Sequence, residues 1–198
     1  HGENDKHYFN QLETSGYKAL EELRKYGHIK AVGLGVNEVD ICERAMNIGQ
    51  FDCFLLAGRY SLLEQSPLES FLPKCQAHGA SIILGGPYNS GILATGVRGK
   101  VIPHYDYQPA PKHIIDTVAK IETVCDEYQV TLAAAALQFP LGHAAVASVI
   151  PGLGSAERVH QTLELFSEQI PSEFWQALKD KNLLNSAAPL PISNGLFS

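Results

Sequence analysis

The sequence predicts an α/β fold in which a parallel β-sheet is covered by helices. Four short apolar segments show no polar alternation, which is typical of strands buried on both faces of a parallel sheet. A segment with helical spacing separates each of them from the next, and glycines stand where several of these helices would end. The 198 residues are 45% hydrophobic and 18% charged, a globular composition with length for one sizeable core or two small ones.

The predicted elements follow one another in a regular order. The first helix carries an apolar residue at every third position from Tyr17 to Tyr26 and ends at Gly27, and Gly49 and Gly79 close the next two helices. The strands are expected at residues 31–36, 51–58, 80–86 and 145–150, and the helices at 14–27, 38–49, 66–79, 112–130, 131–139, 155–166 and 172–184.

Two segments lack any periodicity. Residues 87–111 are rich in glycine, proline and aromatic residues, and a connection of this length is unusual in a compact domain, which indicates a functional role. The tail at residues 187–198 is rich in proline, and we expect it to be loosely held.

A doubly wound sheet and a (β/α)8 barrel both satisfy this pattern. A whole barrel takes about 250 residues, and four units that begin with a helix would form its second half. The sheet of such a half would be open at both edges, which favours a missing amino-terminal half, and the chain begins with His1 rather than methionine. We therefore expect residues 1–198 to form a single domain, the carboxyl-terminal half of a (β/α)8 TIM barrel.

Composition excludes several classes of function. A formal net charge of -6 and a pI near 5.7 argue against non-specific binding to nucleic acid or to anionic membranes. The apolar runs are too short and broken to span a bilayer. The four cysteines have no C-x-x-C spacing and the eight histidines form no zinc motif, so we expect reduced thiols, no metal site and a cytoplasmic location.

Polar and aromatic residues follow all four predicted strands, at the edge where a barrel builds its site. Ser155 is a good N-cap, and an arginine in the first turn of that helix would be explained by a bound phosphate, although this motif alone favours a plain capped helix with a solvated arginine. A Gly-Pro turn with a packed tyrosine is the corresponding alternative after the third strand. The residues at these strand ends are Asn37, Arg59, Tyr60, Gly85, Gly86, Tyr88, Asn89, Gly152, Gly154, Ser155 and Arg158.

The stretches "IKAVGLGVNE", "LLAGRYSLLEQ", "GGPYNSGIL", "YDYQPAP", "AAALQFPLGH" and "SVIPGLGSAERV", in this order, resemble the carboxyl-terminal half of an aldo/keto reductase. The resemblance runs from about Thr14 to Leu184. It is strongest to the sugar-dehydrogenase branch, the D-threo-aldose 1-dehydrogenase or L-fucose dehydrogenase group, with pyridoxal 4-dehydrogenase and L-galactose dehydrogenase as relatives.

The resemblance implies a barrel that binds NAD or NADP. Arg158 matches the arginine that faces the adenosine phosphate and Gln161 a residue near the adenine, whereas Gly152 stands where many NADP-preferring members carry lysine. The other implied cofactor contacts are Asn37, Gly85, Gly86, Tyr88, Asn89, Gly154 and Ser155. The family's catalytic Asp, Tyr, Lys and His lie on the first four strands, so we expect no catalytic residue in this chain, which alone would be inactive.

The expected reaction is oxidation of an aldose at C1 to the lactone. Sugars pack their C–H faces on aromatic rings, so we expect Tyr105 and Tyr107, with Arg59 and Tyr60, to form the substrate wall. A packed surface loop is the alternative interpretation of residues 87–111. The expected partners are a small sugar or aldehyde and the amino-terminal half of the same protein, and the oligomeric state stays open. The alternatives are a relative that acts on pyridoxal or other aldehydes and a catalytically inert half-barrel that binds a nucleotide.

Overall fold

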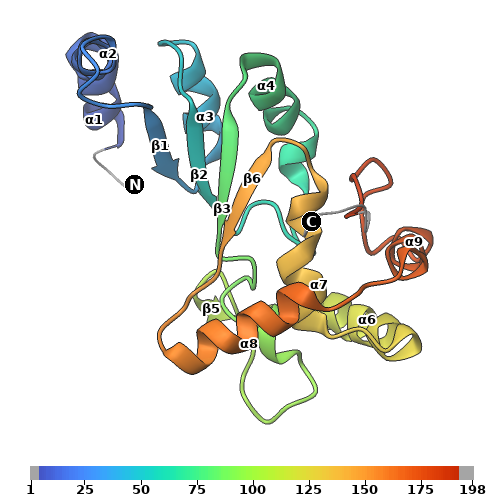
Figure 1. Ribbon diagram of the computed structural model, residues 1–198. Coiled ribbons are helices and arrows are strands. Elements are labelled where there is room, and N and C mark those ends of the chain that lie inside the picture. The colour runs from blue at the N-terminus through green and yellow to red at the C-terminus, as the bar shows by residue number, and fades with distance from the viewer. Residues whose placement is uncertain (1–4, 192–198) are drawn as a thin grey trace.

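The computed structural model describes residues 5–191 and contains a central sheet of four parallel strands (Figure 1). The strands are β1 (Gly33–Val36), β2 (Cys53–Ala57), β3 (Ser81–Gly85) and β6 (Val146–Ile150), in the spatial order β1-β2-β3-β6. Each neighbouring pair is parallel, which confirms the predicted α/β fold with a parallel sheet.

Helices connect the strands close to the predicted positions. Their bounds are α1 (Asp5–Gln11), the π-helical turn η2 (Leu12–Gly16), α2 (Tyr17–Lys25), α3 (Val39–Met46), the 3-10 turn η3 (Ser66–Leu68), α4 (Phe71–His78), α5 (Ile92–Thr95), α6 (Lys112–Tyr128), α7 (Leu132–Gln138), the 3-10 turn η4 (Phe139–Gly142), α8 (Ala156–Ser167) and α9 (Ser172–Asp180). Gly27 and Gly79 follow α2 and α4 with positive φ, the glycine-terminated ends that the sequence predicts.

The segment predicted to be irregular, residues 87–111, contains a small hairpin. Strand β4 (His104–Tyr105) pairs antiparallel with β5 (Gln108–Pro109), and Asp106 and Tyr107 form the turn between them. Figure 1 shows this hairpin and α8 near the same end of the sheet, where the parallel strands finish.

The hydrophobic core lies on one face of the sheet. Phe54, Leu56, Ile82 and Leu84 point to this face and are fully buried beneath the helices. The opposite face is exposed or half-buried, and β1 has no buried residue. The expectation of strands buried on both faces is therefore wrong for this chain, because within residues 5–191 no layer covers the second face. The outer sides of β1 and β6 are likewise unpaired within those residues, and the half-barrel remains a prediction.

The beginning of the tail contacts the fold. Ala188 is 1% exposed, and a Cβ atom built at Gly142 would lie 2.7–2.8 Å from backbone atoms of residues 189–191. Residues 187–191 therefore pack against the turn before β6. The remainder of the tail predicted to be loose, residues 192–198, lies outside the described residues.

Tyr60 belongs to the aromatic core. It is 0% exposed, and its ring centroid lies 5.2 Å from that of Phe139 and 5.7 Å from that of His143. The substrate-wall role expected for Tyr60 is corrected, since the ring is enclosed by core side chains. His143 accepts a hydrogen bond from the Ala145 N–H at its Nδ1 (3.1 Å), and burial lowers its pKa from the ordinary value of 6.5.

We expect Gly142→Ala to destabilise the protein by about 1–3 kcal/mol, the usual cost of overpacking. The new methyl group would meet the backbone of residues 189–191, which has no flexible end to move aside. Urea unfolding measures the effect. Gly99→Ala is the matched control, because its Cβ would meet nothing nearer than 4.0 Å, and a change of more than about 0.5 kcal/mol there would contradict the comparison.

The free energy of unfolding is expected to fall as the pH drops below 6.5. The unfolded chain takes up a proton at His143 in this range, whereas the folded chain holds the ring neutral until a lower pH, so protonation favours unfolding. His143→Asn retains an acceptor for the Ala145 N–H but does not titrate, and should flatten this pH dependence. The exposed His160, changed to Asn, should not.

Candidate functional site

A cavity of about 240 Å³ lies where strands β1, β2 and β3 end. Parallel strands bring their following loops to one edge of a sheet, so residues distant in sequence meet here. The hairpin between β4 and β5 forms the remaining wall. The lining residues are Asn37, Ala57, Gly58, Arg59, Gly86, Asn89, Ser90, Asp106 and Tyr107.

Asn89 joins the loop after β2 to the loop after β3. Its Oδ1 accepts a hydrogen bond from the Ser61 hydroxyl (2.5 Å), and its Nδ2 donates to the Gly58 carbonyl (3.1 Å). Both Ser61 and Asn89 are buried, at 0% and 4% exposed. The amide oxygen and nitrogen of Asn89 both bind the protein itself, so its side chain fixes the shape of the cavity that it lines, and its predicted role as a cofactor contact stays a prediction.

Glycines provide the sharp turns at the same two loops. Gly58 and Gly86 have φ values of 65° and 59°, a region that side chains disfavour. The Gly58 N–H donates to the Gly85 carbonyl at 2.8 Å, which ties the two strand ends together. Gly85 itself is the last residue of β3 and faces Ala57, so it flanks the cavity without lining it.

Arg59 and Asp106 form an ion pair across the cavity. The Arg59 Nη1 lies 3.3 Å from both carboxylate oxygens, and the two side chains are 32% and 55% exposed. Screening by water leaves such a pair with about 0–1 kcal/mol of stabilising effect. Its main consequence is geometric, because it holds the hairpin turn against the loop after β2.

The hairpin turn is strained at both of its central residues. Asp106 and Tyr107 have φ values of 47° and 63°, a combination that favours Asn-Gly in hairpins. A left-handed tyrosine costs roughly 1–2 kcal/mol. The Tyr107 N–H donates to the Ser90 hydroxyl (3.0 Å), while its side chain is 84% exposed.

A second group of predicted residues surrounds the start of α8. The Ser155 hydroxyl accepts from the Arg158 N–H (3.2 Å), the capping contact that the sequence predicts. Gly152 and Gly154 have open space around them, and Arg158 forms no ion pair within residues 5–191. The Gln161 amide donates to Glu157 (3.2 Å). Accessible backbone, a helix N-terminus and an unpaired guanidinium fit a phosphate group.

Two further predicted tyrosines do not line the cavity. The Tyr88 hydroxyl is buried without a hydrogen-bond partner among the described residues, and burial raises the pKa of this group. Tyr105 packs partly against the core, and its pKa is also raised by burial. Both rings are half-buried and pack against the core, and the predicted stacking face at Tyr88 and substrate contact at Tyr105 stay predictions.

Sequence reasoning missed Ser61, Ser90 and Asp106. In the sequence, Ser61 is one polar residue in an apolar run, and the neighbouring residues give no indication that its side chain is buried. Asp106 carried a usable signal, because aspartate tolerates the left-handed region and marks turns. The signal could not be used, because Asp106 lies within residues 87–111, where the sequence predicts no strands for a turn to connect.

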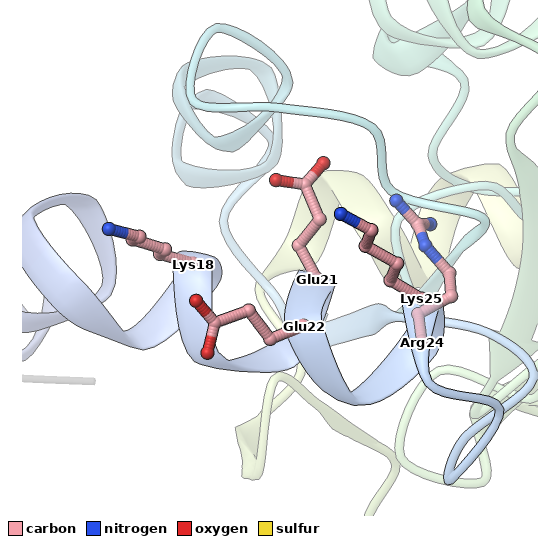
Figure 2. Close-up of a pocket in the computed structure, with 5 residues that line it drawn as sticks. All are labelled: Lys18, Glu21, Glu22, Arg24 and Lys25. Carbon is pink, nitrogen blue, oxygen red and sulfur yellow. The ribbon is translucent and has the colours of Figure 1, made fainter.

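The other surface features of residues 5–191 give weaker indications of a functional site than the cavity does. The depression in Figure 2 is lined by Lys18, Glu21, Glu22, Arg24 and Lys25, all from helix α2, and these side chains project outward from the helix rather than converging on one point. Within residues 5–191, no group of three His, Cys, Asp or Glu side chains is placed to hold a metal ion. No helix in that range has the length and apolar character needed to cross a membrane.

Parallel strands in chain order alternate with helices and have the candidate cavity at their carboxyl ends, which defines an α/β protein with its candidate site at that edge of the sheet. The family model "Aldo/keto reductase family" matches residues 4–183. The chain therefore belongs to the aldo/keto reductase family, a family of oxidoreductases, which confirms the family that the sequence resembles; the restriction to a carboxyl-terminal half stays a prediction, and the expected preference for the sugar-dehydrogenase branch is not supported, because the match to a pyridoxal 4-dehydrogenase is stronger.

Relatives agree with this assignment, and a solved structure shows the same fold. The chain is 44% identical over 186 residues to pyridoxal 4-dehydrogenase of Microbacterium luteolum, covering 93% of the chain and 54% of that protein. It is 33% identical over 180 residues to D-threo-aldose 1-dehydrogenase of a Pseudomonas species, covering 91% and 54%. An aldo-keto reductase from Bacillus halodurans in its holo form superposes with a TM-score of 0.66 at 23% identity, covering 86% and 56%. The chain thus spans about half the length of these proteins.

We expect Asn89→Ala to destabilise the protein by about 1–3 kcal/mol, because the Ser61 hydroxyl and the Gly58 carbonyl would lose the Asn89 amide as a partner. Asn89→Asp keeps the acceptor for Ser61 but places a buried carboxylate oxygen against the Gly58 carbonyl, and should show a loss at least as large. Chemical denaturation measures both. The exposed Asn47, changed to alanine, is the control, and equal losses at positions 47 and 89 would refute the clamp.

Proposed function

We propose that the protein is an NAD(P)-dependent dehydrogenase that oxidises a small carbonyl compound in its hydrated or cyclic form, with pyridoxal as the first candidate substrate. The observation that carries this proposal is the 44% identity to a pyridoxal 4-dehydrogenase over 93% of the chain. The identity to the aldose dehydrogenase is 33%. The cavity at the strand ends supports the proposal, since family membership and strand topology both indicate a site at this edge.

The residues at the start of α8 would hold the cofactor. The Arg158 guanidinium and the backbone N–H groups after β6 would bind its phosphate, and Gly152 and Gly154 leave room for close approach. Gln161 would lie near the adenine, as the family resemblance implies. When bound, the nicotinamide accepts a hydride from the substrate carbon.

The cavity would form part of the substrate site. The free nitrogens of Arg59 offer hydrogen-bond donors and Tyr107 offers an exposed ring, whereas Asn37 would contact the cofactor, as the family resemblance implies. The family's catalytic Asp, Tyr, Lys and His would lie on strands outside these 198 residues, where a tyrosine would take the hydroxyl proton. This chain would then contribute binding and orientation, and would not turn over substrate alone.

Oxidation of an aldose at C1 to the lactone is the second candidate. It is supported by the 33% identity to D-threo-aldose 1-dehydrogenase. A half-barrel that binds a nucleotide without catalysis is the corresponding non-enzymatic alternative, and a direct assay separates the three.

The test is turnover by the full-length protein with pyridoxal and with L-fucose, each with NAD⁺ and NADP⁺, followed by absorbance of the reduced nicotinamide. We expect oxidation of pyridoxal, and Arg158→Ala should raise the KM for the nucleotide about tenfold with kcat retained, as loss of a charged hydrogen bond predicts. Arg98→Ala, at an exposed ion pair with Asp126, is the control. Nucleotide binding without turnover of either substrate would refute the dehydrogenase proposal.

A further inference from the structure

A second cavity, of about 620 Å³, lies between helix α6, the loop after β2 and the segment that follows α9. Its walls include Leu62 and Gln65 of the loop, Lys120 of α6 and residues 181–186, and it shares no residue with the cavity at the strand ends. Figure 1 shows α6 and α9 close together, away from α1 and α2. The volume lies within the range of roughly 300–1,000 Å³ that is usual for ligand pockets.

Hydrogen bonds and an ion pair fix the segment after α9 against the other two walls. The Asn185 N–H donates to Gln65 Oε1 (2.8 Å), and Gln65 Nε2 in turn donates to the Leu62 carbonyl (2.9 Å). The Lys181 ammonium pairs with the Glu127 carboxylate of α6 at 2.7 Å. The walls are therefore held in place before any ligand binds, which lowers the entropic cost of binding.

The polar groups left free in this cavity are mainly hydrogen-bond donors. Two of its acceptors are occupied by the protein, since Asn185 Oδ1 accepts from the Ala187 N–H (2.9 Å) and the Ser186 carbonyl accepts from Lys179 Nζ (2.8 Å). By contrast, the Asn185 Nδ2, the Ser186 N–H and hydroxyl, and the Lys120 ammonium have no partner among the described residues. A ligand that accepts several hydrogen bonds would satisfy these groups.

The charges around the cavity favour an anion. Lys120 is exposed and unpaired within residues 5–191, and Lys181 also lines the cavity, with its charge shared by Glu127. Among the described residues that form the lining there is no aspartate and no glutamate. Because the whole chain has a formal net charge of -6, this positive lining is a local feature and does not follow from the overall composition.

The end of α9 does not oppose an anion with free carbonyl groups. A helix carries partial negative charge at its carboxyl end, where the last carbonyls lack helical partners. Here the Ala177 carbonyl accepts from the Lys181 N–H (3.1 Å), and the Lys179 carbonyl accepts from the Asn182 N–H (2.9 Å). The positive charge of Lys181 stands at the same helix end and offsets the dipole.

We propose that this cavity is a second binding site, which takes a phosphate group with Lys120 as the opposing charge. A phosphate presents at least three acceptor oxygens around one centre, and so matches donors that come from Lys120, Asn185 and Ser186 better than a planar carboxylate does. Lysine is a common phosphate ligand, as a point charge. The inference does not rest on the proposed function, because none of these residues belongs to the cofactor or substrate contacts assigned above.

The test is titration of the full-length protein, labelled with ¹⁵N-asparagine, with inorganic phosphate and separately with glycerol 3-phosphate, followed by two-dimensional NMR. The signals of Asn182 and Asn185 report on the cavity, and the exposed Asn47 is the reference. Sodium chloride at equal ionic strength controls for screening. Lys120→Gln removes the opposing charge, whereas Lys112→Gln removes an exposed charge from the same helix outside the cavity.

We expect the signals of Asn182 and Asn185 to shift and saturate with a Kd in the millimolar range, while that of Asn47 stays in place. Lys120→Gln should weaken the Kd about tenfold, as the loss of a charged hydrogen bond predicts. Lys112→Gln should stay within about twofold of the original value. Tighter binding of glycerol 3-phosphate would identify a phosphate ester as the ligand, and tighter binding of inorganic phosphate the free ion; both support the site.

Three results would overturn the inference: shifts at Asn182 and Asn185 that do not saturate, equal shifts with sodium chloride, or equal losses in the two lysine variants. Phosphate that binds only where Arg158→Ala abolishes it, with the signals of Asn182 and Asn185 unmoved, would likewise overturn it and leave the proposed function standing. Saturable binding at this cavity without turnover of pyridoxal or L-fucose would have the opposite meaning.

Discussion

The buried amide of Asn89 is the interaction on which the candidate site depends. Strand pairing brings the ends of β2 and β3 to one edge, but it leaves the direction of the following loops undetermined. The two side-chain hydrogen bonds of Asn89 fix both loops, since one reaches Ser61 and the other Gly58. Arg59 belongs to the loop after β2 and Ser90 to the loop after β3. Each contacts one residue of the hairpin turn, since Arg59 pairs with Asp106 and the Ser90 hydroxyl accepts from the Tyr107 N–H. The cavity wall is thus built outward from one buried side chain.

The two candidate binding regions at the strand ends, the start of α8 and the cavity, differ in the kind of ligand group that they suit. The start of α8 is exposed and offers backbone N–H groups with an unpaired arginine, which suits a charged and well-solvated group. The cavity between β1, β2 and β3 is smaller, and its charges are already paired. Both regions are open to water, which screens their charges, so the start of α8 is distinguished by its backbone N–H groups and the cavity by its shape.

The sequence was sufficient for the strands and most helices because buried strands and glycine-terminated helices carry strong local signals. It also located Asn37, Arg59 and Asn89 at the strand ends, but it could not assign their side-chain directions. Tyr60 and Arg59 are neighbours in the chain, yet one enters the core and the other lines the cavity. The β4–β5 hairpin escaped prediction because two-residue strands have no periodicity, and its Asp-Tyr turn lacks the usual glycine.

The strand order β1-β2-β3-β6 repeats the order of the strands along the chain. During synthesis, each new strand therefore meets a partner that has already left the ribosome, and the sheet can grow by addition at one edge. The addition of β6 closes the longest loop, from Gly85 to Val146, which contains the hairpin and α6. Because the entropic cost of closure rises only slowly with loop length, this connection can accept changes in length at a small cost in folding free energy. Variation in the length of the segment after β3 is therefore compatible with an unchanged sheet.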